Sequence, residues 1–138
     1  MSTVIRPEVS ERHLYFLPKH RFYELRHFCL QYPMWQRTKR SIDGYKADSE
    51  IEKISRECFW KSSVESAFEL RERLNEKIEM VEHCAKDADN DIWRWLLKGV
   101  TEGLSYTALA CTYELPCSKD YYYDRFRRFF WLLSRERG

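Results

Sequence analysis

The sequence predicts an all-α protein, a helical bundle that ends in a helix-turn-helix. Apolar residues recur at spacings of three and four in several segments, which is the period of a helix with one buried face. No segment of strand length alternates apolar and polar residues, and only four glycines and four prolines interrupt the 138 residues. We divide the chain into an N-terminal helical region, residues 1–62, and a long helix plus helix-turn-helix module, residues 63–138.

The first predicted helix follows an irregular arm that Leu17 and Pro18 bring to an end. It runs from about Lys19 to Tyr32. Four apolar residues repeat on it at helical spacing and are expected to be buried: Phe22, Leu25, Phe28 and Cys29.

The next segment opens at Pro33 and runs to a predicted turn at Asp43 and Gly44. Trp35 lies in it among basic residues, where an indole could either fill the core or rest against a phosphate backbone. The core is the favoured interpretation. A short helix is then predicted from about Ser49 to Trp60.

The longest predicted helix runs from about Val64 to Ala88, and Ser62 and Glu65 have the spacing of a capping box at its start. One apolar stripe follows its length: Ala67, Leu70, Leu74, Ile78, Val81 and Ala85. A single stripe over about seven turns suits an antiparallel helix of the same chain or a coiled-coil homodimer. Packing within the chain is the default interpretation, and the homodimer through Val64–Ala88 is the alternative.

Three further helix starts are predicted after residue 88. Asn90 is expected to cap a helix over residues 92–100, and Ser105 is expected to cap a short one. The chain then breaks at residues 114–117, because Pro116 lacks the amide hydrogen that a continuous helix needs. Ser118 is expected to cap the final helix.

The final helix separates into two faces at 100° per residue. The apolar face is expected to be buried: Tyr122, Phe126, Phe129, Phe130 and Leu133. The remaining arc holds Tyr121, Asp124, Arg125, Arg127 and Arg128. Residues 117–138 carry six Lys/Arg against three Asp/Glu, so the exposed side is cationic. The break at residues 114–117, the two serine caps and the arginines of the open arc together favour a particular function for this helix. They indicate a recognition helix for a DNA major groove rather than an ordinary solvated surface.

Seven residues are the candidates for contacting double-stranded DNA: Ser118, Lys119, Tyr121, Tyr122, Arg125, Arg127 and Arg128. The first half of a recognition helix supplies base contacts, which assigns Lys119, Tyr121, Tyr122 and Arg125 to base edges. Arg127 and Arg128 lie further along and are expected to bind the phosphate backbone. Tyr122 also lies on the apolar face of the helix at 100° per residue, so it suits the core as well.

Two runs carry a family resemblance: LKGVTEGLSY at residues 97–106 and LPCSKDYYYDRFRRFFWLLS at residues 115–134. They resemble the C-terminal part of small phage-encoded proteins, the RinA/ArpU-type transcriptional regulators of late genes, whose last module is similar to the sigma-factor helix-turn-helix. The resemblance covers about residues 63–137. It implies an all-helical fold and sequence-specific DNA binding at a phage or prophage promoter, most simply as a late-gene activator in the cytoplasm of a bacterial host.

Charge is segregated along the chain. Residues 1–46 carry nine basic and four acidic side chains, a net of +5, whereas residues 47–116 carry nine basic and fifteen acidic ones, a net of −6. The C-terminal +3 restores the total of +2. Only the two ends therefore favour a polyanion.

Enzymatic, metal and membrane functions are not indicated. The five cysteines (Cys29, Cys58, Cys84, Cys111 and Cys117) contain no C-x-x-C pair, so they are expected to be buried free thiols. His20, Glu24 and His27 share one helix face, but three ligands without a fourth are a weak metal signal. We find no catalytic motif, no cofactor motif and no membrane-spanning run.

Two other functions remain open. A small terminase-like DNA-packaging protein also uses a helix-turn-helix, and assembles into rings. Alternatively, Trp131, expected to be exposed opposite the core face, and the Tyr121–Tyr123 cluster could bind RNA polymerase or another protein.

Overall fold

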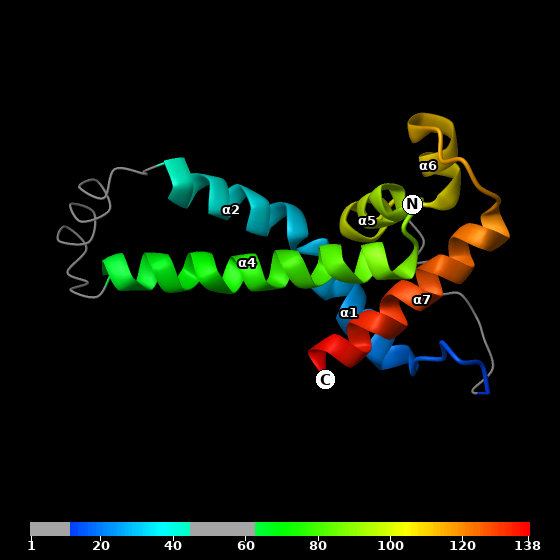
Figure 1. Ribbon diagram of the computed structural model, residues 1–138, viewed down its shortest axis with the longest axis horizontal. Helices are drawn as coiled ribbons and strands as arrows, with labels where there is room; N and C mark the ends of the chain where they lie inside the picture. Colours follow the sequence, from blue (N-terminus) through cyan, green and yellow to red (C-terminus); the bar gives the residue numbers. More distant parts are fainter. Residues whose placement is uncertain (1–11, 45–62) are drawn as a thin grey trace. The chain divides into compact units, whose positions relative to one another are not determined.

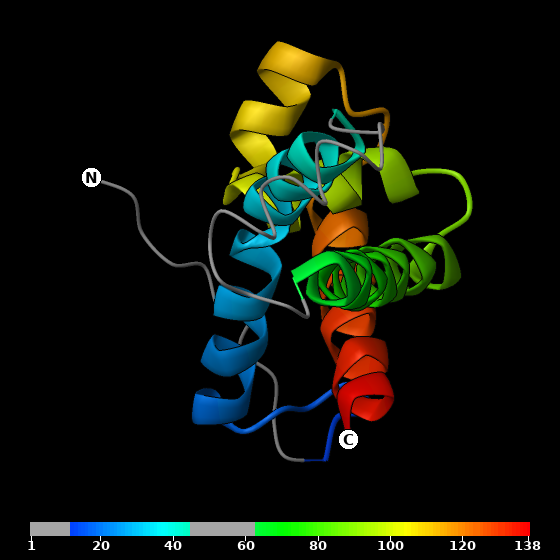
Figure 2. The same ribbon diagram turned by 90° about the vertical axis from the view of Figure 1, so that its left-hand side faces the viewer.

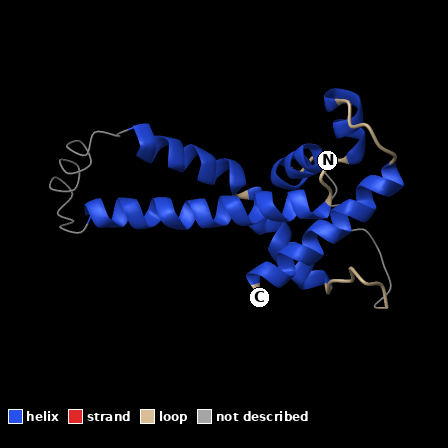
Figure 3. Cartoon of the chain, in the orientation of Figure 1, coloured by secondary structure: helices blue, strands red, loops and turns tan. Residues whose placement is uncertain are grey.

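The computed structural model describes residues 12–44 and 63–138, with side chains over 12–42 and 67–138. Every regular element in these ranges is an α-helix (Figure 3), which confirms the predicted all-α class for them. The helices, labelled in Figure 1, are α1 (Lys19–Leu30), α2 (Tyr32–Gly44), α4 (Ser63–Ala88), α5 (Trp93–Glu102), α6 (Tyr106–Tyr113) and α7 (Lys119–Arg137). The predicted helix over 49–60 and the predicted cap at Ser62 lie outside the described residues.

The chain forms two compact units. Unit 1 comprises Met1–Gln31 and Met80–Gly138, and unit 2 comprises Tyr32–Glu79. Unit 1 thus contains α1, the last turns of α4, and α5 to α7, whereas unit 2 contains α2 and the first part of α4.

The core of unit 1 is aromatic. Helix α1 packs against α5 and α7, and Figure 2 shows α1 and α7 side by side. The ring of Phe22 in α1 lies 5.1 Å from that of Phe130 and 6.2 Å from that of Phe126. All four apolar residues predicted for the buried face of α1 are buried, as are all five predicted for α7. The helical periods of these two segments were therefore assigned correctly.

The structure tests three local predictions in the first half of the chain. Two are corrected and one is confirmed. The first helix ends at Leu30 rather than at Tyr32, because Tyr32 begins α2, whose first turn accommodates Pro33 without loss of a hydrogen bond. The turn predicted at Asp43 and Gly44 is wrong, since α2 continues through Gly44. Within unit 2, Trp35 is 2% exposed, which confirms it as a core residue.

The connection between α4 and α5 also differs from the prediction. Asn90 was expected to cap α5, but Asp89 satisfies the free amides instead. Its Oδ1 accepts from the backbone N–H of Asp91 at 2.8 Å and of Ile92 at 2.9 Å. Both residue types suit this role, so the choice depends on which side chain the turn directs inward.

The apolar stripe of α4 is buried only in part. Leu74, Ile78, Val81 and Ala85 are buried, whereas Ala67 and Leu70 are half-buried and the neighbouring Phe68 is 49% exposed. The homodimer through this helix stays a prediction.

Candidate functional site

The candidate site is the segment from α6 to the first turns of α7. Both helices begin at the predicted serines: Ser105 Oγ accepts from the N–H of Ala108 and Ser118 Oγ from the N–H of Tyr121, each at 3.2 Å. Asp120 lies in the first turn of α7, as predicted. Both caps follow from local sequence alone, which explains why they could be predicted.

A sharp reversal separates the two helices. Helix α6 ends at Tyr113 and is capped by Glu114, whose φ of 56° places it in the left-handed region. The N–H of Leu115 then donates to the carbonyl of Leu109 at 3.2 Å. Leu109 and Leu115 are both buried, so the turn is attached to the core. The Tyr106 hydroxyl donates to the carbonyl of Cys117 at 2.6 Å, which fixes the end of the connection to the start of α6.

Tyr122 is a correction to the list of DNA contacts. Its side chain is 0% exposed and lies against Gly99 of α5, where a Cβ atom would collide with the tyrosine hydroxyl. This burial raises the pKa of the Tyr122 phenol above its ordinary value. Tyr122 therefore belongs to the core. Tyr123, which we did not predict to be buried, is also a core residue, and its hydroxyl accepts from the N–H of Tyr106 at 3.3 Å.

Tyr121 is exposed, but its hydroxyl is already hydrogen-bonded. The side chain is 42% exposed, and the hydroxyl donates to Asp89 Oδ2. Burial opposes ionisation of Asp89, but the bonds from Tyr121, Ile92 and Asp91 and the nearby Arg125 together lower the pKa of its carboxyl. The carboxylate thus joins the first turn of α7 to the start of α5.

Arg125 and Arg128 bind the C-terminal end of α4 in unit 1. Arg125 Nη1 donates to the carbonyl of Ala88 at 3.4 Å, and Arg128 Nε donates to that of Asp87 at 3.3 Å. Cations are favourable there because the last carbonyls of a helix are unsatisfied and carry the negative end of its dipole.

Further contacts hold each guanidinium in place. Arg125 Nε donates to Asp124 at 3.0 Å and its guanidinium stacks on the Tyr121 ring at 5.5 Å, while Arg128 Nη1 donates to the Tyr15 hydroxyl at 3.1 Å. Although its burial opposes the charge, Asp124 raises the pKa of Arg125. Sequence reasoning placed both arginines on the open arc and missed these partners, since most of them lie far away along the chain.

Lys119 and Arg127 are the cations of the candidate set that stay available. Lys119 is exposed, and its ammonium has no partner among the described side chains. Arg127 is half-buried: its Nε is buried without a hydrogen-bond partner within residues 12–42 and 67–138, so only the end of its guanidinium can reach a ligand. Ser118 is exposed, but its hydroxyl oxygen is used by the cap.

Trp131 is not the free surface residue that we expected. It is half-buried between the Tyr15 ring at 5.5 Å and the Arg135 guanidinium at 4.7 Å. The segment before α1 thus covers this side of α7, and no sequence signal in either segment indicates that pairing.

The other sequence candidates behave as follows. No cluster of potential metal ligands occurs within the described residues, and Glu24 forms an ion pair with Arg21 at 2.8 Å. Cys29 and Cys84 are buried as predicted, but Cys111 is exposed and Cys117 is half-buried; Cys58 lies outside the described residues. None of the described helices combines the length and the apolar character that a bilayer span requires.

Comparison with known proteins finds no counterpart. No family model matches the chain, and neither the curated proteins nor the solved structures include a significant match.

Proposed function

We propose that α6, the turn at residues 114–118 and α7 form a DNA-binding helix-turn-helix, and that the protein is a transcriptional regulator. The family resemblance of residues 97–134 extends this proposal to a phage or prophage promoter, with activation of late genes as the simplest role. RNA polymerase is then a natural second partner.

One observation carries the proposal: α7 exposes residues at its start, while Tyr122 and the later turns are anchored in the core. Ser118, Lys119 and Tyr121 are open to solvent, whereas Phe126, Phe129 and Leu133 are buried. A recognition helix needs this arrangement, since its N-terminal residues must reach base edges while the rest of it is held by the supporting helices.

Within this proposal, the roles of the candidate residues differ from those expected from the sequence. Lys119 is the cation best placed for a base edge or an adjacent phosphate, and Arg127 for the backbone. To contact DNA, Arg125 and Arg128 would have to exchange the α4 carbonyls for a phosphate or a base. Their net contribution to the binding free energy is therefore smaller. The Tyr121 ring can pack against a sugar or a base, but its hydroxyl is already used.

Binding-site selection on a random duplex library tests the proposal. We expect the wild type to select a defined sequence, and Lys119→Ala to lose about 1–3 kcal/mol of binding free energy and relax one base position. Arg127→Ala should weaken all duplexes alike and leave the selected sequence unchanged. Lys86→Ala is the matched control, because Lys86 is a cation of unit 1 outside α6 and α7 and stacks over Trp93 at 4.8 Å.

Two results would contradict the proposal: selection of no sequence by the wild type, or equal behaviour of Lys119→Ala and Lys86→Ala.

The position of the selected site in the phage genome then separates two roles. A site beside a promoter supports a regulator, whereas a packaging-initiation site, combined with a ring-sized mass in solution, would indicate a small terminase-like protein.

A further inference from the structure

The outward face of α1 gathers hydrogen-bond donors, and its one carboxylate, that of Glu24 beside His20 and His27, is paired with Arg21. Five residues share it within an arc of about 120° at 100° per residue, opposite the buried residues of the same helix. We call this face the α1 stripe: Lys19, His20, Tyr23, Arg26 and His27. Lys19, His20 and His27 are exposed, and Tyr23 and Arg26 are half-buried.

Among the side chains of residues 12–42 and 67–138, no carboxylate pairs with the cations of the α1 stripe. Lys19 and Arg26 have no ion pair or hydrogen bond among the described side chains. The acidic residue of α1, Glu24, borders the stripe next to His20 and is paired with Arg21, which also donates to Ser134 Oγ at 3.0 Å. The charge of the stripe is therefore available to an external anion.

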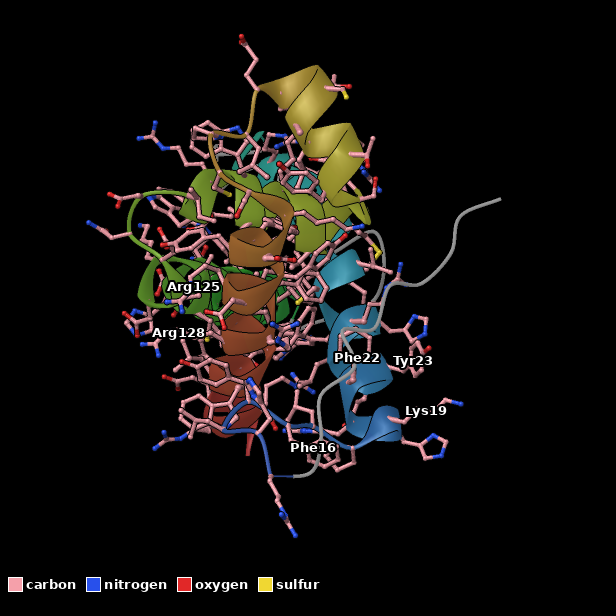
Figure 4. The ribbon with its side chains drawn as sticks, turned by 90° about the vertical axis from the view of Figure 1, so that its right-hand side faces the viewer. Phe16, Lys19, Phe22, Tyr23, Arg125 and Arg128 are labelled. Carbon is pink, nitrogen blue, oxygen red and sulfur yellow. The ribbon has the colours of Figure 1, made fainter. Side chains whose placement is uncertain are left out.

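A second feature of unit 1, the lack of basic residues in α6, indicates which anion the stripe could bind. In a helix-turn-helix the first helix crosses the DNA backbone, but α6 contains no Lys or Arg in its sequence YTALACTY. Two arginines of α7 do not replace them freely, since Arg125 and Arg128 bind the end of α4, which leaves Arg127 of the candidate set for the backbone. In Figure 4 Arg125 and Arg128 lie on the edge of α7 turned away from α1, whereas Lys19 and Tyr23 point away from α7 on the far side of α1.

We propose that the α1 stripe binds phosphate groups of the DNA duplex beside the site contacted by α7. This inference rests on the proposed function and adds a second contact surface to it. Lys19 and Arg26 are about 10 Å apart along the helix axis, and a DNA strand carries one phosphate per about 3.4 Å of axis. The two cations therefore contact different phosphates.

The double variant Lys19→Ala/Arg26→Ala tests the inference in the full-length protein. Two phosphate contacts contribute about 1.8 to the slope of log K against log salt, which corresponds to about 30-fold in affinity between 1 M and 0.15 M salt. We expect the variant to bind a duplex containing the selected site about 30-fold more weakly at 0.15 M salt. Its slope should be flatter by about 1.8, and its sequence preference should be unchanged.

Controls separate this inference from the proposed function. Lys86→Ala/Arg94→Ala removes the same charge from α4 and α5 and should keep the wild-type slope. Lys19→Arg/Arg26→Lys should restore binding, and thermal melting should be unchanged because none of these residues is in the core. A wild type that binds no duplex refutes the proposed function. A wild type that binds, with equal slopes for the two alanine double variants, refutes the α1 stripe alone.

A second copy of the chain is the competing partner, since residues 47–116 carry a net charge of −6. Sedimentation of the same variants decides this point. Loss of a dimer in Lys19→Ala/Arg26→Ala at an unchanged salt slope would assign the stripe to self-association and overturn the DNA assignment.

Discussion

Substitution of Gly99 tests how α5 supports α6 and α7. Gly99 is buried within α5, and a Cβ atom at this position would overlap the Tyr122 hydroxyl and lie 3.0 Å from Leu109 Cδ1. Alanine is intrinsically favoured over glycine in a helix by about 1 kcal/mol. Overpacking of a well-packed core costs about 1–3 kcal/mol. Because Tyr122 is held by buried rings on α7, we expect the overpacking cost to exceed the propensity gain, and Gly99→Ala to destabilise the protein by up to about 2 kcal/mol.

Tyr122→Phe should reverse this effect. The Tyr122 hydroxyl has no hydrogen-bond partner within the described residues, and such a buried group costs about 1–3 kcal/mol. The single variant should therefore be at least as stable as the wild type. With the oxygen removed, the nearest obstacle to a Cβ atom at position 99 is the flexible end of Leu109, so Gly99→Ala should become neutral or stabilising in the Tyr122→Phe background.

Urea unfolding of the wild type, the two single variants and the double variant gives the coupling energy. Residues in contact couple by about 0.5–3 kcal/mol, and here the sign must favour the double variant. Additive effects, or a Gly99→Ala protein more stable than the wild type, would refute the close approach of α5 and α7.

Two further predictions concern titratable groups. The lowered pKa of Asp89 means that its ionised form stabilises the folded state at pH values above about 4, its ordinary pKa range, and that this contribution is lost as the pH falls through the folded-state pKa. The stability difference between the wild type and Asp89→Asn, measured by urea unfolding, should therefore shrink below pH 4, and a constant difference would contradict the bonding to Tyr121. For the thiols, burial raises the pKa of Cys84 to about 12 and that of Cys29 further, whereas Cys111 is exposed. Mass spectrometry after brief alkylation should therefore find Cys111 modified. Cys29 and Cys84 should stay unmodified until the protein unfolds. Equal labelling of all three would show that the core of unit 1 is open.

Helix phase and the two serine caps were predictable because both depend on neighbouring residues, whereas the cap expected at Asn90 was wrong. The buried face of α7 followed from its period, and Ser105 and Ser118 were identified from the residues around them. The failures have a different cause. Tyr122 fits the core and the recognition face equally well by phase, and only the position of Gly99 on another helix decides between them.

The long-range partners could not be predicted at all. Arg125 and Arg128 are exposed on a helical wheel. In the fold, however, both donate hydrogen bonds to the end of α4, and Arg128 also donates to Tyr15. Trp131 was expected to be exposed for the same reason. A wheel describes one helix by itself, and these contacts depend on which other segment packs against it.

These partners determine which variants can establish the function. Arg125→Ala removes a bond to the last turn of α4 as well as any contact with DNA, so weaker binding in that variant has two causes. Arg128→Ala is ambiguous in the same way, through Asp87 and Tyr15. Lys119 has no such partner, and its replacement should leave the free energy of unfolding within about 0.5 kcal/mol of the wild type, as for most surface sites. A loss of binding in Lys119→Ala at unchanged stability is therefore the result that locates DNA contact at the first turn of α7.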